Sequence, residues 1–344
     1  MAHPDLAIVI LNWNGQRFLE QFLPAVIQHS APHRVVLADN ASTDDSVAFV
    51  RTNFPEVEIV INAENGGFAK GYNDALKKVD AELYLLLNSD VEVTENWLDP
   101  LLEAMNDPQV AGCQPKINAF HRKGHFEHAG ASGGFIDRFF FPFCRGRIFS
   151  AIESDHGQYD YPSDIFWATG ACMLIRSEVY WNTGGLDERF FAHMEEIDLC
   201  WRAQRMGHRF MVIPASTVYH VGGGTLDYLS PRKTYLNFRN SLLMIHKNYD
   251  GMLLWMLFRR MSLDGIAATV FLFKGQFPHF WAVFTAHMSF YKLLSSSRIE
   301  RKKYAHLKGE ILTGKYRGSI LFARYIQGVK DFSKLNQRLF KNEN

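Results

Sequence analysis

Four short apolar runs divide the first ninety residues of the chain. They cover residues 6–11, 33–38, 57–61 and 82–87, and a helical pattern follows the first of them from residue 16 to about residue 29. Short runs rich in Val, Ile and Leu are typical of buried strands in a parallel sheet. The alternation of such strands with helical segments predicts an α/β domain with right-handed crossovers.

Polar side chains follow all four predicted strands. In open parallel sheets, ligands bind beyond the carboxyl ends of the strands. Turn chemistry accounts for some of these residues, but it does not require an acid or an amide after every strand. We therefore predict a nucleotide site built from these strand ends: Asn12, Asn14, Asp39, Asn40, Asn65, Asn73, Asn88 and Asp90.

Two common nucleotide motifs are absent from the sequence. No GxGxxG follows the first strand, which argues against a dinucleotide fold, and no GxxxxGK[ST] occurs, which excludes a P-loop. What remains is one acid at the end of the second strand, Asp39, and another after the fourth, Asp90. Asp39 can accept a hydrogen bond from a base or a ribose, and Asp90 can hold a cation against a diphosphate.

A second group of acids lies in the middle of the chain. Glu195, Glu196 and Asp198 fall within four residues, at the predicted start of a helix. On a helix, Glu195 and Asp198 share a face, and Glu196 points about 100° away from Glu195. An acidic first turn is favoured by the helix macrodipole, but carboxylates this close repel one another unless they meet a cation or a proton donor. Asp198 also stands four residues before Arg202, a spacing that favours a structural ion pair.

The segment 119–164 mixes glycine, aromatic and basic residues without a regular period. We interpret it as an insertion or loop beside the predicted site, with the character of a lid. Its Arg145 and Arg147 can bind a phosphate, or they can lie on a solvated surface; the sequence leaves both open.

Strand patterns stop near residue 230, so we divide the chain into a catalytic domain, 1–230, and a helical segment, 231–344. Residues 233–247 form an amphipathic helical pattern. Two apolar stretches follow, 252–273 and 277–294, but charges interrupt the first, and a spanning helix needs about twenty residues with few charges. We expect both helices to lie on the inner leaflet of a membrane, with nearby cations facing lipid phosphates: Lys292, Arg298, Arg301, Lys302 and Lys303. Packing on the catalytic domain and a homodimer interface are the alternatives.

Composition bears on which partners the protein can bind and on its cellular compartment. The 344 residues hold 37 Lys and Arg against 36 Asp and Glu, a net charge of +1, which argues against nucleic acid as a partner. The four cysteines have no metal-ligand spacing, so structural zinc is not expected and a reducing compartment fits. No secretory signal is visible at the N-terminus. We predict a cytoplasmic protein that is peripheral on the inner face of the membrane.

Taken in order, these motifs resemble those of the family-2 glycosyltransferases, which have the A-type nucleotide-diphospho-sugar fold. The similarity covers roughly residues 5–245 and is greatest to the rhamnosyltransferase-like branch. It implies a mostly parallel, Rossmann-like sheet flanked by helices, with a C-terminal helical extension. The segments that carry the resemblance are 9–15, 39–44, 65–73, 86–90, 170–176, 184–188, 195–202 and 220–225.

The resemblance implies a donor site for a nucleotide-diphospho-sugar. The loop of Asn12 and Asn14, together with Asp39, would hold the nucleobase and the ribose, and Asn65, Lys70 and Asn73 would line the same pocket. Asn88, Ser89 and Asp90 match the family's DxD-type metal motif, with Asn in place of the first Asp. His220 matches a histidine that completes the metal site or touches the diphosphate. Asp90 and His220 would thus hold Mn²⁺ or Mg²⁺, and the imidazole favours Mn²⁺.

The resemblance also implies an inverting transfer in the synthesis of a cell-surface polysaccharide. Glu196 would be the general base that takes the proton from a hydroxyl of a glycan or lipid-linked acceptor. Glu195 would hold sugar hydroxyls, and Asp198, although it belongs to the same acidic set, is better explained by its pair with Arg202.

Two other functions remain open from the sequence. A nucleotidylyltransferase on a related sheet would need a glycine-rich basic loop after the first strand, and residues 12–15 lack the basic residues. A catalytically weak sugar-nucleotide-binding module would keep the fold without the chemistry, and the Asn88 replacement leaves room for it.

Overall fold

The computed structural model describes residues 5–222, 230–307 and 312–340. The glycines and threonine that follow Gly222 in the histidine motif lie outside the described residues.

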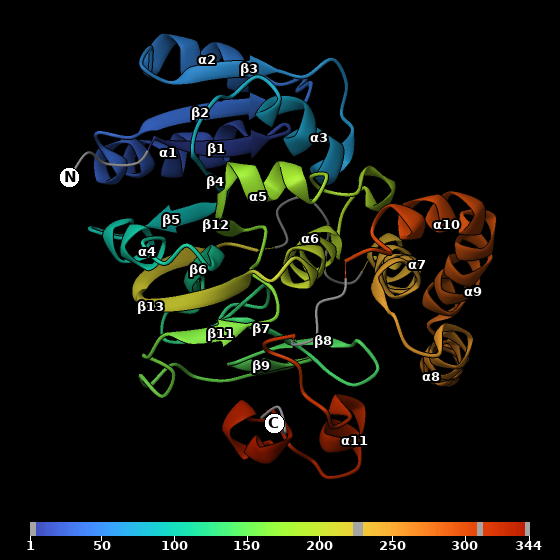
Figure 1. The fold of residues 1–344 in the computed structure, drawn as a ribbon. Helices are drawn as coiled ribbons and strands as arrows, with labels where there is room; N and C mark the ends of the chain where they lie inside the picture. The colour runs from blue at the N-terminus through green and yellow to red at the C-terminus, as the bar shows by residue number, and fades with distance from the viewer. Residues whose placement is uncertain (1–4, 223–229, 308–311, 341–344) are drawn as a thin grey trace.

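Residues 6–88 form a parallel part of a large sheet (Figure 1). All four predicted strands are confirmed, and β1 pairs in parallel with β2 and β4, and β2 with β3. In this register Asn12 lies opposite Asp39, and Leu11 lies opposite Asn88, so the polar strand ends meet at one edge. The elements are β1 (Leu6–Asn12), α1 (Gln16–Ser30), β2 (Arg34–Asp39), α2 (Ser46–Asn53), β3 (Glu58–Ile61), α3 (Gly67–Leu76) and β4 (Leu83–Asn88).

The second half of the sheet is not parallel throughout. β12 runs antiparallel to both β4 and β6, and β13 is parallel to β6 but antiparallel to β5 and β11. The whole sheet is therefore mixed, with the order β11-β13-β6-β12-β4-β1-β2-β3. The elements added here are β5 (Val91–Val93), α4 (Asp99–Ala104), β6 (Val110–Ala119), β11 (Ser163–Ile165), β12 (Cys172–Arg176), α5 (Ser177–Asn182), α6 (Glu195–Arg205) and β13 (Arg209–His220).

Side chains of β1 alternate between two cores. Ala7 and Val9 belong to one hydrophobic cluster, while Ile8 and Ile10 belong to the other. This follows from the two-residue period of a strand. Helix α3 covers the first face and α1 covers the second. Both faces are thus buried, which is why the strands are apolar along their whole length.

The segment 119–164 folds into a second, smaller sheet. Its strands are β7 (Gly134–Ile136), β8 (Pro142–Cys144), β9 (Arg147–Ile148) and β10 (Ala151–Ile152). The tail packs on this sheet, because the ring centroids of Phe332 and Phe135 lie 4.8 Å apart. Within the tail, the ring centroids of Tyr316 and Phe340 lie 4.9 Å apart. The tail, which includes α11 (Ile320–Tyr325), therefore completes an aromatic core beneath β7 and β8.

Four helices follow the large sheet, drawn in orange in Figure 1. The first of them, α7, begins with a side-chain cap: the hydroxyl of Ser230 accepts a hydrogen bond from the amide of Arg232. Pro231 occupies the first turn of the same helix, a position where proline is favoured. Within the described part of the chain, no helix is long and apolar enough to cross a membrane. The four are α7 (Pro231–Asn248), α8 (Leu253–Phe273), α9 (Phe277–Lys292) and α10 (Leu294–Lys303).

Candidate functional site

A cleft of about 1020 Å³ opens at the carboxyl ends of β1 and β4. The large sheet forms its floor, the start of α6 and the loop before it form one wall, and residues of β8, β9, α7 and α8 complete the lining. The cleft contains Asn14, Asn65, Asn88, Ser89, Asp90, Glu195, Glu196 and His220 of the predicted site residues. The structure thus brings together residues that are up to two hundred positions apart in the sequence.

Two loop amides border the cleft on the side of β1 and α3. Asn14 accepts a hydrogen bond from the amide of Thr43 at 2.7 Å, and Asn65 accepts from the amide of Gly67 at 3.0 Å. Gly67 has φ +78, and a Cβ there would lie 2.6 Å from the ring of Phe191, so this close approach requires glycine. These contacts hold both loops in place around the cleft.

Asn12 and Asp39 lie beneath the lining rather than in it. Asn12 is fully buried and donates from Nδ2 to Asp39 Oδ1 at 3.1 Å, and Asp39 Oδ2 accepts from the amide of Ser42 at 3.0 Å. Both carboxylate oxygens of Asp39 are therefore engaged within the protein. Asn40, which is also one of the predicted strand-end residues, lines the cleft.

Lys70 and Asn73 are also outside the lining. Lys70 pairs with Asp74 one turn later on α3. Asn73 is buried, donates to the carbonyl of Leu186 at 2.8 Å and accepts from the hydroxyl of Tyr180 at 2.7 Å. Asn73 therefore fastens α3 to the loop that leads into the acidic segment.

Asp90 and His220 meet at the deep end of the cleft. Oδ1 of Asp90 lies 3.1 Å from Nε2 of His220, and Nδ2 of Asn88 lies 3.4 Å from the same nitrogen. On the other side of the ring, Oε2 of Glu127 lies 3.4 Å from Nδ1. All three charged residues are buried. Burial alone would lower the pKa of His220, but the two carboxylates outweigh it and raise this pKa to about 10.

These residues fit a divalent cation. Adjacent ligands of an octahedral ion lie roughly 3 Å apart, which is close to the separation of Asp90 Oδ1 and His220 Nε2. Glu127 contacts Nδ1, so Nε2 would face a metal ion once the ion replaces the proton on that nitrogen. In the described residues no cluster of three or more His, Cys, Asp or Glu side chains could hold a metal. Oxygen atoms of a bound ligand would therefore have to complete the shell.

Glu195 and Glu196 enter the cleft from the first turn of α6. The turn follows a loop in which Phe191, His193 and Met194 have positive φ, a strained conformation of the kind that clusters at functional sites. Burial raises the pKa of Glu196 to about 7, and burial together with the neighbouring charge of Glu196 raises the pKa of Glu195 well above its usual value. Oε2 of each is buried, and both oxygens lack a hydrogen-bond partner within the described residues.

Asp198 points away from this cleft. It is fully buried and accepts from Arg202 Nε at 2.9 Å, from Lys247 Nζ at 2.7 Å and from Asn248 Nδ2 at 2.7 Å. The predicted pair with Arg202 is confirmed. Asp198 joins α6 to α7, and it does not line the cleft.

The opposite wall is basic and aromatic. Arg147, Arg232, Lys233 and Arg260 line it, and Nε of Arg147 is buried without a hydrogen-bond partner. Arg145 is different: it is buried and donates to the carbonyls of Ser132 and Tyr161 at 3.0 and 3.1 Å. The structure therefore separates the two arginines, placing Arg147 at the cleft and Arg145 inside the small sheet.

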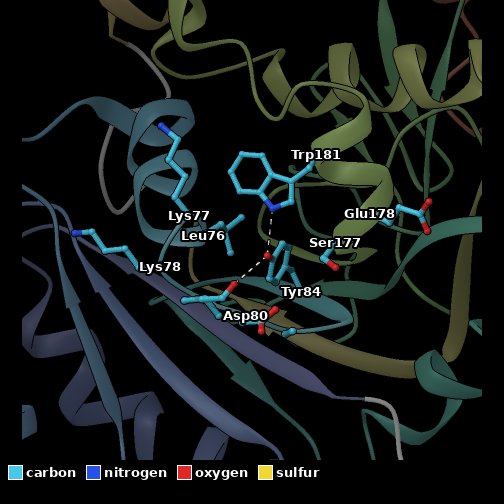
Figure 2. A pocket seen from close by; sticks show the side chains of 10 residues that line it. Leu76, Lys77, Lys78, Asp80, Tyr84, Ser177, Glu178 and Trp181 are labelled. Atoms are coloured by element: carbon cyan, nitrogen blue, oxygen red, sulfur yellow. Dashed lines mark hydrogen bonds between the residues drawn. The ribbon is translucent and has the colours of Figure 1, made fainter.

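A second hollow, of about 550 Å³, lies at the other end of β4. Figure 2 shows the indole of Trp181 pointing to the hydroxyl of Tyr84, which accepts from Nε1 at 3.2 Å and donates to the carbonyl of Val79 at 3.0 Å. The hollow lies at the amino ends of the parallel strands, where α/β sheets do not place their ligand sites. The larger cleft is therefore the candidate active site.

Comparison with known proteins agrees with this geometry. The sequence profile of glycosyl transferase family 2 matches residues 7–184. The chain belongs to glycosyl transferase family 2. The profile covers the loops of β1 to β4 and ends before α6, so Glu195, Glu196 and His220 lie beyond it.

Relatives of this family 2 glycosyltransferase carry names from glycan synthesis in bacteria and archaea. It is 24% identical over 232 residues to the N-acetylglucosaminyl-diphospho-decaprenol L-rhamnosyltransferase of Mycobacterium tuberculosis, a match that covers 62% of this chain and 75% of the relative. It is 23% identical to the low-salt glycan biosynthesis hexosyltransferase Agl10 of Haloferax volcanii, covering 70% of this chain and 75% of that protein. The predicted family and its rhamnosyltransferase-like branch are confirmed, and the protein is a glycosyltransferase.

Solved structures confirm the A-type fold. GalNAc-T7, crystallised with UDP, GalNAc and Mn²⁺, superposes with a TM-score of 0.56 at 16% identity, covering 72% of this chain and 48% of that one. Staphylococcus aureus TarS 1–349 superposes with a TM-score of 0.51 at 16% identity, covering 83% of this chain and 72% of that one. The family assigns the chain to the glycosyltransferases rather than to the nucleotidylyltransferases.

Proposed function

We propose that this glycosyltransferase moves a sugar from a nucleotide-diphospho-sugar to an acceptor hydroxyl with inversion, and that Glu196 is the general base. The observation that carries the proposal is the position of Glu196. Its carboxylate enters the same cleft as Asp90 and His220, its Oε2 has no partner within the protein, and its pKa is about 7. A base whose pKa lies near the working pH is the most effective proton acceptor.

The reaction is a single displacement. Oε2 of Glu196 takes the proton of the acceptor hydroxyl while the hydroxyl oxygen forms a bond to the anomeric carbon of the donor. The bond between that carbon and the diphosphate oxygen breaks, and the electron pair leaves with the nucleoside diphosphate. A divalent cation, Mn²⁺ or Mg²⁺, would be held by Asp90 and His220 and would act as a Lewis acid toward the diphosphate. The Mn²⁺ bound with UDP to GalNAc-T7 supports this choice.

Glu195 has a different role in this proposal. Burial and the neighbouring charge of Glu196 raise its pKa well above its usual value, which favours the protonated carboxyl, and a protonated carboxyl can donate a hydrogen bond to a sugar oxygen. The two neighbouring acids thus divide into a proton acceptor and a proton-bearing hydrogen-bond donor. Burial makes this division possible because it disfavours two adjacent carboxylates.

The donor nucleotide is proposed to lie over the ends of β1 and β4. Asn14 and Asn65 border this side directly, and Asn88 and Ser89 lie next to Asp90. Asn12 and Asp39 act from beneath, by holding the loop that follows β2. Asn73 acts on the loop that leads to α6 through the carbonyl of Leu186, and Lys70 reaches the loop before α3 through Glu64 at 3.6 Å.

The acceptor is proposed to be a lipid-linked glycan precursor that carries a phosphate or diphosphate. Arg147, Arg232 and Lys233 place positive charge in the lining of the cleft that holds Glu196, and guanidinium groups bind phosphate well. The Mycobacterium tuberculosis relative is named for such an acceptor, a sugar on diphospho-decaprenol. The enzyme would then act at the cytoplasmic face of the membrane that holds the acceptor, in the synthesis of a surface polysaccharide.

Transfer assays of Glu196→Gln test the proposal. The substitution removes the base and keeps the size of the side chain, and we expect turnover of the cognate donor to fall by about two to four orders of magnitude. Glu178→Gln, on the exposed surface of α5, is the matched control and should leave turnover unchanged. If Glu196→Gln retains the activity of the parent protein, Glu196 is not the base.

A further inference from the structure

The outer face of α8 and α9 is an exposed apolar surface. Trp255 is 49% exposed, Phe273 86%, Phe277 58% and Trp281 57%. Soluble proteins rarely leave so many large apolar side chains together in water, and contiguous patches of this kind mark interaction sites. We call this surface, made of the exposed residues of 254–291 on the two helices, the α8–α9 face.

The spacing of these residues makes the face continuous along α9. Phe277, Trp281, Phe284, Met288 and Tyr291 recur at intervals of four and three residues, which is one side of a helix. The opposite side of the same helix is buried and packs toward α7 and α8. Helix α9 is therefore apolar on both sides, although the protein covers only one of them.

Charge on this face has a single sign. On α8, on α9 and in the turn between them, the only carboxylate is that of Asp264, and it is fully buried. On α10, Glu300 is paired with Lys303 at 2.7 Å. Lys274 in the turn between the helices, Lys292 at the end of α9 and Arg298 on α10 are all exposed at the borders of the face. A two-fold contact with a second copy would bring these cations toward one another with no exposed carboxylate of the face to pair with them.

We propose that the α8–α9 face docks onto the surface of a membrane that contains anionic lipid. Exposed Trp, Tyr and Phe side chains enter the boundary between head groups and acyl chains, and cations at the border meet lipid phosphates. The face supplies both components, and it excludes exposed acids, which the negative membrane surface would repel.

The face is joined to the active-site cleft by one helix. Arg260, on the inner side of α8, pairs with Asp264 at 3.0 Å, stacks over the ring of Phe141 at 3.7 Å and lines the cleft. Its neighbour Arg259 lies over the ring of Trp255 at 5.1 Å, on the exposed side. Docking would thus place the cleft next to the lipid head groups. The use of this arrangement, delivery of a lipid-linked acceptor, rests on the proposed function; the docking itself does not.

Vesicle flotation of the full chain tests the inference. The parent protein should float with vesicles of phosphatidylcholine containing about one third phosphatidylglycerol and should bind pure phosphatidylcholine vesicles less well. The double variant Trp281→Ala, Phe284→Ala should lose about tenfold or more of its partitioning. Ile61→Ala, an exposed apolar residue on β3, is the matched control and should float like the parent protein.

Two further measurements test the role of charge in membrane binding and the independence of membrane binding from turnover. Lys274→Glu with Lys292→Glu should remove the preference for phosphatidylglycerol, whereas Arg51→Glu on exposed α2 should not. The apolar double variant should keep the parent's turnover with a water-soluble acceptor, so a failure of the proposed reaction does not alter the vesicle result. The inference is overturned if the parent protein does not float, if Trp281→Ala with Phe284→Ala floats as well as the parent, or if sedimentation shows a dimer that the same substitutions dissociate.

Discussion

Oε2 of Glu127 lies 3.4 Å from Nδ1 of His220, on the side of the ring that faces away from Asp90. Burial would raise the pKa of Glu127, but its contact with His220 outweighs burial and lowers the pKa to about 2. A carboxylate in this position fixes the imidazole tautomer and its orientation, as outer-shell partners of metal-binding histidines do.

Replacement of Glu127 should therefore weaken metal binding without removing a ligand. We expect Glu127→Ala to lower the affinity for Mn²⁺ in the presence of a nucleoside diphosphate by about 10- to 100-fold, and Glu127→Gln to lower it less, since the amide oxygen can still accept from Nδ1. Titration calorimetry or the Mn²⁺ resonance signal measures this without turnover. Glu56→Gln, at an exposed position, is the control; equal affinities for all proteins would contradict the positioning role.

Removal of Asp90 should abolish the effect of Mn²⁺ on donor binding. A bound ligand raises apparent stability by mass action, so the parent protein should melt at a higher temperature with its cognate nucleotide-sugar, and higher still with Mn²⁺. A thermal-shift series with UDP-, dTDP- and GDP-sugars identifies that donor. In Asp90→Ala the increment that depends on Mn²⁺ should disappear. An undiminished Mn²⁺ effect in this variant would place the cation elsewhere.

The two perturbed acids should make the enzyme less stable as pH rises. Both folded pKa values exceed the unfolded value of 4.5, so the folded state binds more protons. Stability that is present below about pH 4.5 is therefore lost as pH rises, through about 7 in the case of Glu196. Glu195→Gln and Glu196→Gln should therefore match the parent near pH 4.5 and melt at higher temperature than the parent near pH 8. Melting curves across this range, without ligands, measure the difference; a constant gap at all pH values would mean that the carboxyls titrate normally.

The same shift predicts the pH profile of catalysis. Activity should rise with pH as Glu196 loses its proton, with an apparent pKa of about 7 in the parent protein. This rising limb should be absent from the residual activity of Glu196→Gln. Glu178→Gln should keep it. A parent profile that is flat between about pH 5 and pH 9 would argue against a carboxylate base of this pKa.

Asp198 should matter for folding more than for chemistry. Lys247 Nζ bridges Asp187 Oδ2 at 2.6 Å and Asp198 Oδ2 at 2.7 Å. Asp198→Ala therefore leaves the buried Arg202 without its carboxylate partner and Lys247 with only one of its two. The expected cost is about 3–5 kcal/mol of unfolding free energy. Asp250→Ala, which removes a half-exposed partner of Arg205, should cost about 1 kcal/mol or less. Denaturant titration measures both. Lost turnover in Asp198→Ala with unchanged stability would instead indicate a catalytic role.

Local patterns predicted much of this molecule. The strands β1 to β4 and the helices α7 to α9 follow from hydrophobic periodicity, and the strand-end residues of a parallel sheet must share one edge, so the meeting of Asn14, Asn88 and Asp90 could be anticipated. The pair of Asp198 and Arg202 follows from helical spacing alone.

The features that could not be predicted from the sequence depend on contacts between distant segments of the chain. Glu127 reaches His220 because β13 runs parallel to β6, with His220 opposite Ala119, and because Phe126 then bridges back to Asn118. No local signal marks a register of this kind. Burial depth was equally invisible: Asp39 and Asn12 occupy the predicted strand ends, yet their side chains satisfy one another below the cleft. The antiparallel β12 and the ordered small sheet likewise depend on contacts between distant segments.

Residues 313–340 cannot be removed without exposing the core of the small sheet. Phe332 and Phe340 pack against Phe135 and Phe143, and the amide of Thr313 donates to Gln204 of α6 at 2.8 Å. A shortened gene that stops after α10 would leave the aromatic interior of the small sheet open to water, although every catalytic candidate would still be encoded. The tail and the segment 119–164 therefore form one folding unit, and a recombinant enzyme should retain both.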